Sequence, residues 1–598
     1  MELLWRIWSF LSRRRQWQIV VLTLLMLVGT FLEMLSLGSV LPFLAVLIDP
    51  SKVFERPELA KLIAYLGITT PAGLVAPLTL AFVALVLVAG AARLALAWAT
   101  HFAAFVIGSD LSGEVYRRTL YQPFSVHVAR NSSEVISGIT KKVTHVILTI
   151  QNLLIGLTSA ILSVGIMVAL LLIDPLMATS AAVLFGGSYL LVAVMTRRRL
   201  LKNGVVMQKA STRVIQVLQE GLGGIRDVLL DGTQDTHVLT YVKVDKPLRR
   251  ATASNAFIAA SPRLYMETFG AACIALLAFV LTQRGSGLAG FLPTLGVLAM
   301  GAQRLLPAFQ QVYAGYAYFA GHHASIEDIV TLLQQPLPAH ALGPPAEPLA
   351  FQRELRFEHV SFRYSGTEAQ VLRDVDLVIK KGQRVGFVGK TGGGKSTALD
   401  LLMGLLEPTE GVILVDGQPI VGNHGRSWQR TIAHVPQSIF LSDATMAENI
   451  AFGVPPTKID LARVKQAARI ARIDEFIESQ PDGYNATVGE RGVRLSGGQR
   501  QRLGIARALY RHASVLVFDE ATSALDNTTE RELMEALEGL SRDLTVLMIA
   551  HRLSTVAHCD MIVLLDQGKV LATGTYAELM ESNEVFSSLA AQARAHEP

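Results

Sequence analysis

Long apolar stretches fill the first half of this 598-residue chain and limit what it can fold into more than any other feature. Six of them have roughly the 20 residues that a helix needs to cross the hydrocarbon core of a bilayer. We therefore predict an all-α transmembrane domain of six helices. The spans are expected near residues 18–47, 76–107, 146–173, 176–196, 264–283 and 288–318.

The composition also indicates that part of the chain lies in lipid. The chain is 51% hydrophobic and 17% charged, whereas soluble domains average about 25% charged residues. High hydrophobicity excludes a disordered chain, and two cysteines, Cys273 and Cys559, are too few for a disulfide framework. We attribute the net charge of +5 to basic residues retained on the cytoplasmic side of a membrane, and expect no nucleic-acid partner.

Basic residues beside the predicted spans set the orientation. Arg13–Arg15 precede the first span and Arg197–Arg199 follow the fourth, while Asp174 and Pro175 form a tight turn between spans three and four. Lys and Arg stay on the cytoplasmic side, so both termini are expected there. Segments 108–145 and 197–262 then become helical cytoplasmic protrusions.

The pattern changes after the last span. We predict a transmembrane domain over 1–330, a proline-rich linker over 331–351 and a soluble α/β domain over 352–598. Short apolar runs in the last part, Arg384–Val388 and Val515–Phe518, are typical of buried parallel strands.

A glycine-rich stretch follows the first of these strands. Gly389–Thr397 matches the phosphate-loop pattern and lies between a strand and an apolar helix. Its glycines let backbone N–H groups converge on phosphates, Lys395 would reach the β- and γ-phosphates, and Ser396 would coordinate Mg²⁺. The residues predicted to bind nucleotide here are Gly389, Thr391, Gly392, Gly393, Gly394, Lys395, Ser396 and Thr397.

The second strand ends in two carboxylates. Asp519 is placed to hold Mg²⁺, and Glu520 to polarise the attacking water at the carboxyl end of the strand. Acids after an apolar strand are usually structural, but a phosphate loop in the same domain favours catalysis.

Leu495–Gln499 reads LSGGQ and opens a helix rich in Arg and Ala. In this motif the chain resembles the ATP-binding cassette family, and the resemblance extends over its whole length. It implies a half-transporter exporter with a P-loop nucleotide-binding domain, ATP and Mg²⁺ as cofactors, and a domain-swapped homodimer in the inner membrane. Each ATP would lie between the phosphate loop of one copy and the signature of the other, which comprises Ser496, Gly497, Gly498 and Gln499.

The same resemblance assigns further residues. Tyr364 looks like the aromatic that stacks on adenine, and Gln437 like the glutamine that senses Mg²⁺ and the membrane domain. Asp526 belongs to the loop between the two nucleotide sites, and His551 is similar to the histidine that contacts the γ-phosphate. The expected catalytic set is Glu520, His551 and Gln437, and the expected Mg²⁺ set is Ser396, Gln437 and Asp519.

Charges inside spans point to the cargo, because they are costly in lipid. For Glu33 and Glu267 we favour a structural role, either pairing with arginines that locks helices together or snorkelling near an interface. Arg93, Arg263 and Arg304 instead suit a diphosphate, which arginine binds bidentately.

The cargo class rests on a further resemblance. Phe31–Met34, Pro262–Glu267 and the cytoplasmic Arg130–Glu134 are similar to the lipid-linked oligosaccharide flippases of protein glycosylation. That group implies flipping of a polyprenyl-diphosphate oligosaccharide from the cytoplasmic to the periplasmic leaflet. An amphipathic helix over Glu58–Leu66 would meet the lipid tail or cap the outer helix ends. The alternatives are export of another amphipathic lipid of lipid A type, export of hydrophobic drugs, and a non-transporting ATPase that regulates a membrane partner.

Overall fold

The computed structural model describes residues 2–40, 43, 46–47, 50–51, 70–173, 175, 179, 182–283, 288–338, 341, 343–344, 346–520, 535, 543–550 and 553–596. The amphipathic helix expected over Glu58–Leu66 lies outside these residues. The chain divides into two compact units. The membrane unit comprises residues 1–122 and 130–337, and the cassette unit comprises residues 123–129 and 338–598.

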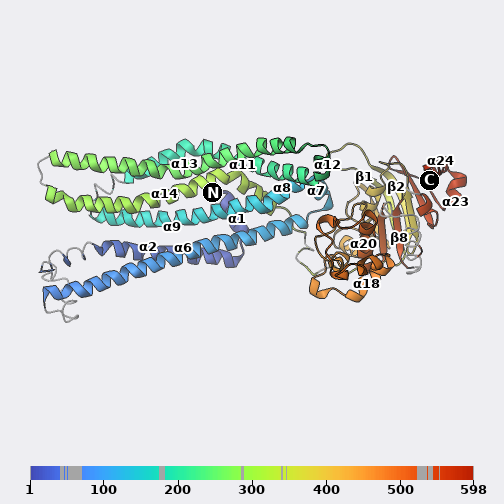
Figure 1. Cartoon of the computed structure of the whole chain (residues 1–598), viewed down its shortest axis with the longest axis horizontal. Coiled ribbons are helices and arrows are strands. Elements are labelled where there is room, and N and C mark those ends of the chain that lie inside the picture. Colours follow the sequence, from blue (N-terminus) through green and yellow to red (C-terminus); the bar gives the residue numbers. More distant parts are fainter. Residues whose placement is uncertain are drawn as a thin grey trace. The chain divides into compact units, whose positions relative to one another are not determined.

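Long helices build the membrane unit and run side by side over much of their length (Figure 1). Among the described residues, six helices exceed 25 residues: α2, α6, α9, α11, α13 and α14. The elements of this unit are α1 (Glu2–Phe10), α2 (Arg13–Gly38), η1 (Pro71–Leu74), α6 (Val75–Leu120), α8 (Ser132–Ser137), η2 (Gly138–Lys142), α9 (Val143–Ile173), η3 (Ala182–Gly186), α11 (Gly187–Gly223), α12 (Ile225–Leu230), α13 (Gln234–Gln283) and α14 (Leu288–Leu333). The short helix α7 (Phe124–Ala129) groups with the cassette unit.

Within the described residues, three helical stretches are long and apolar enough to cross a membrane. They are Arg13–Ser36, Pro71–Leu120 and Ser132–Val168, in the regions of the first three predicted spans. The spans predicted near 264–283 and 288–318 lie in α13 and α14. The span predicted near 176–196 begins outside the described residues and continues into η3 and α11.

Several helices continue well past the predicted span ends. Helix α6 runs on to Leu120, and α13 starts at Gln234 and continues through Pro247 and Pro262 to Gln283. The prediction that segments 108–145 and 197–262 are helical is therefore confirmed. The proline at 262 does not begin a new helix, because packing over a 50-residue helix outweighs the loss of single backbone hydrogen bonds.

Glycines let α9 and α14 approach closely. A Cβ atom on Gly315 would lie 2.9 Å from the carbonyl oxygen of Asn152, and one on Gly156 would lie 3.3 Å from that of Gln311. One turn further along, the Ser159 hydroxyl donates a hydrogen bond to the side-chain oxygen of Gln311. Small residues with an interhelical hydrogen bond are the means by which helices associate where lipid removes the hydrophobic driving force.

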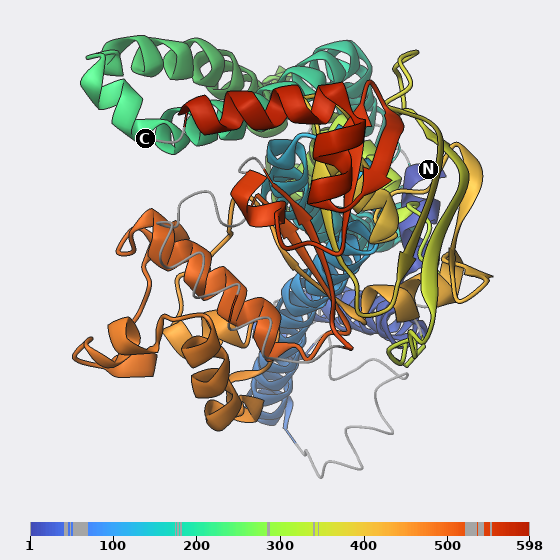
Figure 2. The same cartoon turned by 90° about the vertical axis from the view of Figure 1, so that its right-hand side faces the viewer.

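The cassette unit contains two sheets and a helical group. Its elements are β1 (Glu354–Phe362), β2 (Leu372–Lys380), β3 (Arg384–Val388), α15 (Lys395–Leu402), β4 (Glu410–Val415), β5 (Gln418–Pro419), α16 (Gly422–Gln429), β6 (Ile432–Val435), α17 (Met446–Ile450), η5 (Pro456–Lys458), α18 (Leu461–Ile470), α19 (Asp474–Glu478), η6 (Gly483–Asn485), η7 (Glu490–Gly492), α20 (Gly497–Tyr510), β7 (Val515–Asp519), β8 (Thr545–Ile549), α22 (Leu553–Val556), β9 (Met561–Asp566), β10 (Lys569–Gly574), α23 (Tyr576–Ser582) and α24 (Glu584–His596). Figure 2 shows the helices from α17 to α20 gathered beside the strands. The two strands expected from the sequence are confirmed as β3 and β7.

The larger sheet has the order β10-β9-β3-β8-β7-β6, and the smaller antiparallel sheet has the order β2-β1-β4-β5. In the larger sheet β9, β3, β8, β7 and β6 are parallel, and β10 pairs antiparallel at the edge. Strand β7 alternates between two cores: Val515 and Val517 enter the core that includes α15, whereas Leu516 and Phe518 enter the core that includes α20. Because both faces of β7 are covered, this strand is apolar from Val515 to Phe518.

The α9–α14 contact gives the first prediction. We expect Gly315→Ala to lower the stability of the purified protein by about 1–3 kcal/mol, because a methyl group 2.9 Å from a backbone oxygen must push the two helices apart. Gly113→Ala is the matched control, since its Cβ would meet nothing within 4 Å on α6. That variant should be neutral or more stable by up to about 1 kcal/mol. Thermal unfolding in detergent would decide, and equal stability of the two variants would contradict the close packing.

Candidate functional site

The predicted phosphate loop connects β3 to α15 and is shaped by its backbone. Gly389 has a φ of +151°, and a Cβ atom there would lie 1.8 Å from the carbonyl oxygen of Leu565 at the end of β9. Gly394 has a φ of +98° and precedes the first residue of α15. Since neither position tolerates a side chain at ordinary cost, the loop keeps its N–H groups close to the start of a helix, where an anion is favoured.

Lys395 is buried at the start of α15. Its ammonium group donates hydrogen bonds to the carbonyl oxygens of Gly389 at 2.8 Å and Lys390 at 3.0 Å. Burial lowers the pKa of Lys395, and the carboxylates of Glu520 and Asp519 oppose that effect. A partly buried cation between a glycine loop and two acids is suited to binding polyphosphate.

The carboxyl ends of β7 and β6 bring the predicted catalytic and metal residues together. Asp519 ends β7 and Glu520 follows it, in a left-handed backbone conformation with a φ of +51°. Gln437, two residues after β6, donates a hydrogen bond of 2.5 Å from its amide nitrogen to the Glu520 carboxylate. Left-handed backbone at a non-glycine residue is uncommon and concentrates at functional sites.

Tyr364, the predicted adenine contact, lies beside the phosphate-binding helix. Its hydroxyl is 3.2 Å from the Thr397 hydroxyl, and its ring meets that of Phe362 edge-on with centroids 5.0 Å apart. Two of the residues predicted to bind nucleotide are therefore neighbours, although Tyr364 comes from the end of β1 and Thr397 from α15.

Ser496 caps α20, so the signature is a helix start. Its hydroxyl accepts a hydrogen bond from the Gln499 backbone N–H at 3.2 Å, and the Gln499 side chain accepts one from the Ser496 backbone N–H at 2.8 Å. This reciprocal capping fixes the first turn of α20. Gly497 and Gly498, in that turn, present backbone N–H groups at the positive end of the helix dipole.

Asp400 is a titratable residue that the sequence analysis did not select. Burial raises its pKa to about 6, and the neighbouring charge of Asp519 contributes further. Asp400 lies among apolar residues in the second half of α15, and no local sequence pattern marks it as buried. Asp400 therefore places a group that titrates near pH 6 beside Asp519, at the end of β7 where Mg²⁺ binding is predicted.

Arg507 is a second residue outside the predicted set. It donates hydrogen bonds to the carbonyl oxygens of Asn449 and Phe440, both at 2.8 Å, and stacks on the ring of Phe452. Burial lowers its pKa to about 10. Arg507 therefore ties α20, which carries the signature, to the segment that follows Gln437.

The three arginines predicted to bind substrate fall on three helices. Arg93 of α6 pairs with Glu33 of α2 at 3.3 Å, and Arg263 pairs with Glu267 one turn along α13 at 2.6 Å. The ion pair of Glu33 joins two helices as expected, whereas that of Glu267 lies within α13 and does not lock two helices together. Arg304 lies on α14, and its side chain is outside the described part of the structure.

Two predicted nucleotide-site residues, Asp526 and His551, also lie outside the described residues. The residues that are described provide a suitable donor set for Mg²⁺ and a triphosphate. The Ser396 hydroxyl, the Asp519 carboxylate and the Gln437 amide oxygen are hard ligands of the kind that Mg²⁺ prefers. The glycine loop, which a Cβ atom would obstruct at Gly389 and Gly394, leaves backbone N–H groups for the phosphates.

Comparisons with known proteins agree with this geometry. Residues 372–523 match the model of the ABC transporter family. An ATP-dependent lipid A-core flippase from Cupriavidus metallidurans is 31% identical over 80% of each chain. A putative multidrug export ATP-binding/permease protein from Staphylococcus aureus is 44% identical over 41% of this chain and 43% of its own.

The fold also has a counterpart among solved structures. The structure of a bacterial Atm1-family ABC exporter with ATP bound superposes with a TM-score of 0.79, covers 97% of this chain and 99% of the other, and shares 25% of its residues. The glycine loop, the acidic end of β7 and the LSGGQ helix start are thus found in a chain whose likeness covers both units. The chain belongs to the ATP-binding cassette transporters, as an export-type half-transporter that couples the hydrolysis of ATP to transport across a membrane.

Proposed function

We propose that this transporter moves an amphipathic lipid with a phosphorylated head group, of the lipid A class, between the leaflets of a bacterial inner membrane. The lipid A-core flippase of C. metallidurans matches over 484 residues, a length that must include much of the membrane unit as well as the cassette. The match to the putative multidrug exporter covers 248 residues, about the length of the cassette alone. Since cargo is selected in the membrane unit, the first relative is the better guide.

A cavity in the membrane unit carries this proposal. It has a volume of about 1000 Å³ between α1, α11 and α14, at the upper end of the usual range for ligand sites. Aromatic side chains contribute part of its wall: Tyr189, Phe309, Tyr313, Tyr316 and Phe319. The first four of these rings form three contacts, with centroids 5.9–6.3 Å apart.

The lining is polar towards one end. Contacts between α11 and α14 advance together along both helices, from Tyr189 and Tyr313 to Gly204 and Gly321, so the two helices run parallel. Arg197 follows the aromatic residue on α11, and His323 and Glu327 follow those on α14. An apolar wall that ends in a guanidinium group suits acyl chains attached to a phosphorylated head group.

A polyprenyl-diphosphate oligosaccharide is the second candidate cargo. Arg93 and Arg263 keep 56% and 53% of their side chains exposed despite their ion pairs, so several guanidinium N–H groups stay accessible to a diphosphate. In this candidate Arg93, Arg263 and Arg304 would contact the diphosphate. It shares the phosphorylated lipid head group with the first candidate and differs in the tail and the sugar.

ATP hydrolysis is proposed to supply the energy for transport. Glu520 accepts a proton from the attacking water, and Gln437 holds the Glu520 carboxylate in place through its 2.5 Å hydrogen bond. Bound Mg²⁺, held by Ser396, Gln437 and Asp519, would neutralise charge that develops on the phosphates. His551 would contact the γ-phosphate, and Tyr364 the adenine.

Two copies of the chain are needed in this proposal. Each copy supplies one phosphate loop and one signature, and each ATP would lie between the loop of one copy and Ser496–Gln499 of the other. Asp526 would lie between the two sites. Both termini and the cassette would face the cytoplasm, since basic residues flank the spans on that side.

The role of Glu520 gives a prediction. We expect Glu520→Gln to retain ATP binding, because the glutamine is isosteric, and to hydrolyse ATP at less than a few per cent of the parent rate, because an amide does not accept the proton. Glu407→Gln, on an exposed loop residue, is the control and should hydrolyse ATP normally. Equilibrium binding and phosphate release would be measured, and brisk turnover in Glu520→Gln would refute its role as the base.

The cargo gives another prediction. Lipid A should stimulate the ATPase of the protein in liposomes, and Arg197→Ala should raise the concentration for half-maximal stimulation about tenfold, since one charge-assisted hydrogen bond is lost. Arg198→Ala, on the next residue of α11 and outside the cavity lining, should respond as the parent does.

The same assay separates the candidates. Stimulation and flipping by a polyprenyl-diphosphate glycan alone, with sensitivity to Arg93→Ala and Arg263→Ala, would replace the first cargo with the second. Stimulation by hydrophobic drugs alone would contradict both.

A further inference from the structure

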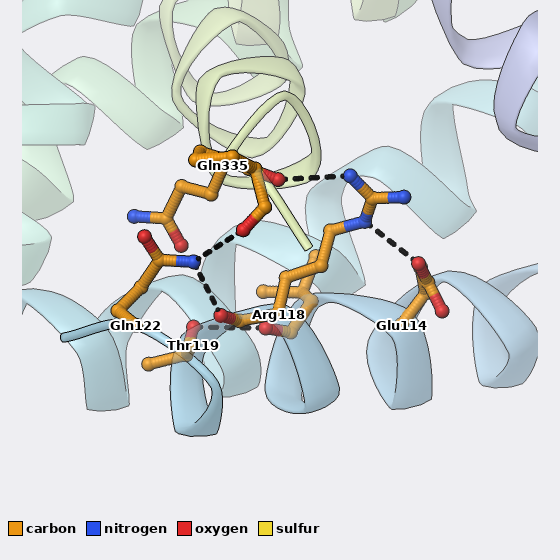
Figure 3. A network of polar contacts seen from close by, with 7 residues as sticks. Glu114, Arg118, Thr119, Gln122 and Gln335 are labelled. Carbon is orange, nitrogen blue, oxygen red and sulfur yellow. Dashed lines mark hydrogen bonds and ion pairs between the residues drawn. The ribbon is translucent and has the colours of Figure 1, made fainter. Parts of the chain in front are cut away.

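A polar network joins the end of α6 to the end of α14 and the start of the linker (Figure 3). We call it the exit clamp. Its members come from segments that lie 217 residues apart in the sequence. They are Glu114, Arg118, Gln122, Arg130, Gln335 and Pro336.

Arg118 is the centre of the clamp. Its Nε donates to the Glu114 carboxylate at 2.7 Å, and its Nη1 donates to the backbone carbonyl of Gln335 at 2.9 Å (Figure 3). The guanidinium also lies over the ring of Phe10 in α1, 5.4 Å from its centroid. One side chain therefore contacts α1, α6 and the residues that end α14.

Gln122 and Arg130 complete the network. The buried Gln122 amide donates to the carbonyl of Arg118 at 2.8 Å and to that of Pro336 at 3.1 Å. With the Gln335 amide oriented to satisfy its hydrogen bonds, its oxygen accepts from both Nη atoms of Arg130, at 2.8 and 3.0 Å. The linker start is thus held from two sides.

The residues of the clamp border the points where the chain crosses between the two units. The chain passes between the membrane unit and the cassette unit after residue 122, after residue 129 and after residue 337. Gln122 and Arg130 are the residues of the membrane unit that border the first two passages, and Pro336 lies next to the last residue before the third. The clamp fastens all three passages to one another.

Apolar packing supports the clamp from within the membrane unit. Val115 and Leu111 of α6, Leu333 of α14 and Ile7 of α1 belong to one buried cluster. The ends of α6 and α14 are therefore held by a core on one side and by hydrogen bonds at their termini. Such an arrangement is stiff, since close-packed interiors and satisfied polar networks transmit displacement rather than absorb it.

We propose that Arg118 and Gln122 are positioning residues for energy coupling, which make the covalent passages between the two units move as one body. A displacement of the cassette then reaches α6 and α14 together. Without the clamp, the linker end of α14 would yield separately, and ATP would be hydrolysed with little response in the membrane unit. This inference rests on ATP-driven transport and does not depend on which lipid is carried.

The alternative is that the clamp caps exposed carbonyl groups at the end of α14, as any helix end requires. Capping alone predicts a loss of stability without a change in the membrane response per ATP hydrolysed. The two roles therefore differ in a ratio that can be measured.

The experiment compares Arg118→Ala/Gln122→Ala with the parent protein in liposomes of phosphatidylethanolamine and phosphatidylglycerol. An environment-sensitive fluorophore on Leu80→Cys, with both native cysteines replaced by alanine, reports on the far end of α6, where the Leu80 side chain is exposed. We expect basal ATPase within about twofold of the parent and an ATP-induced fluorescence change at least fivefold smaller. No cargo is added, so a wrong lipid assignment does not affect the result.

Two further variants keep the test decisive. Arg117→Ala, on the neighbouring exposed arginine of α6, should match the parent in both measurements. Arg118→Lys retains the charge and can reach one carbonyl, so we expect an intermediate fluorescence response. This variant provides the test if the double variant folds poorly. A full fluorescence response in Arg118→Ala/Gln122→Ala, or an equal loss of response and ATPase in Arg118→Lys, would overturn the proposal.

Discussion

The phosphate loop of the cassette depends on the close approach of β9 to Gly389. Strand β3 pairs with β9 in parallel register, and the Leu565 carbonyl occupies the place where any side chain at position 389 would start. The loop therefore turns tightly against β9 before it enters α15. Because β3 lies within the sheet, this one backbone contact fixes the phosphate loop relative to β7 and β6, the strands that Glu520 and Gln437 follow.

The order of strands in the larger sheet explains why the Glu520 carboxylate and the Gln437 amide lie in contact. Strand β7 lies between β8 and β6, so Glu520 and Gln437 follow adjacent parallel strands at the same edge. The left-handed backbone of Glu520 is held by a hydrogen bond from its N–H to the Ile549 carbonyl at 3.3 Å and by neighbouring β8. That strain costs about 1–3 kcal/mol, which a sheet with both faces buried can sustain. Fixed in this way, the proposed base Glu520 would need little rearrangement when it accepts a proton.

Local sequence patterns were enough to predict single strands and the glycine loop, but not the contacts between residues that are distant in the sequence. Strands β3 and β7 were predictable because short apolar runs end in glycine or in acids, and the glycine loop because its spacing is fixed by phosphate geometry. The partnership of Gln437 with Glu520 required the sheet order, and Asp400 gained its raised pKa from burial that no local pattern encodes. Helix α13 ran through Pro262, since packing over many turns outweighs a local helix breaker. The Arg118 contact with Gln335 joins segments far apart in sequence, and neither residue belongs to a motif.

Coupling between ATP hydrolysis and the membrane unit depends on how stiff the covalent connections between the two units are. A sheet whose inner strands are closely packed does not deform gradually, so a change at its carboxyl edge is passed on as displacement of whole elements. Three covalent passages that moved independently would divide that displacement among themselves and dissipate it in side-chain rearrangement. Passages fastened by charged and amide hydrogen bonds at one place share a single displacement. The long helices α6 and α14 then carry it as rigid levers, because backbone hydrogen bonds along each helix resist bending far more than a loop would.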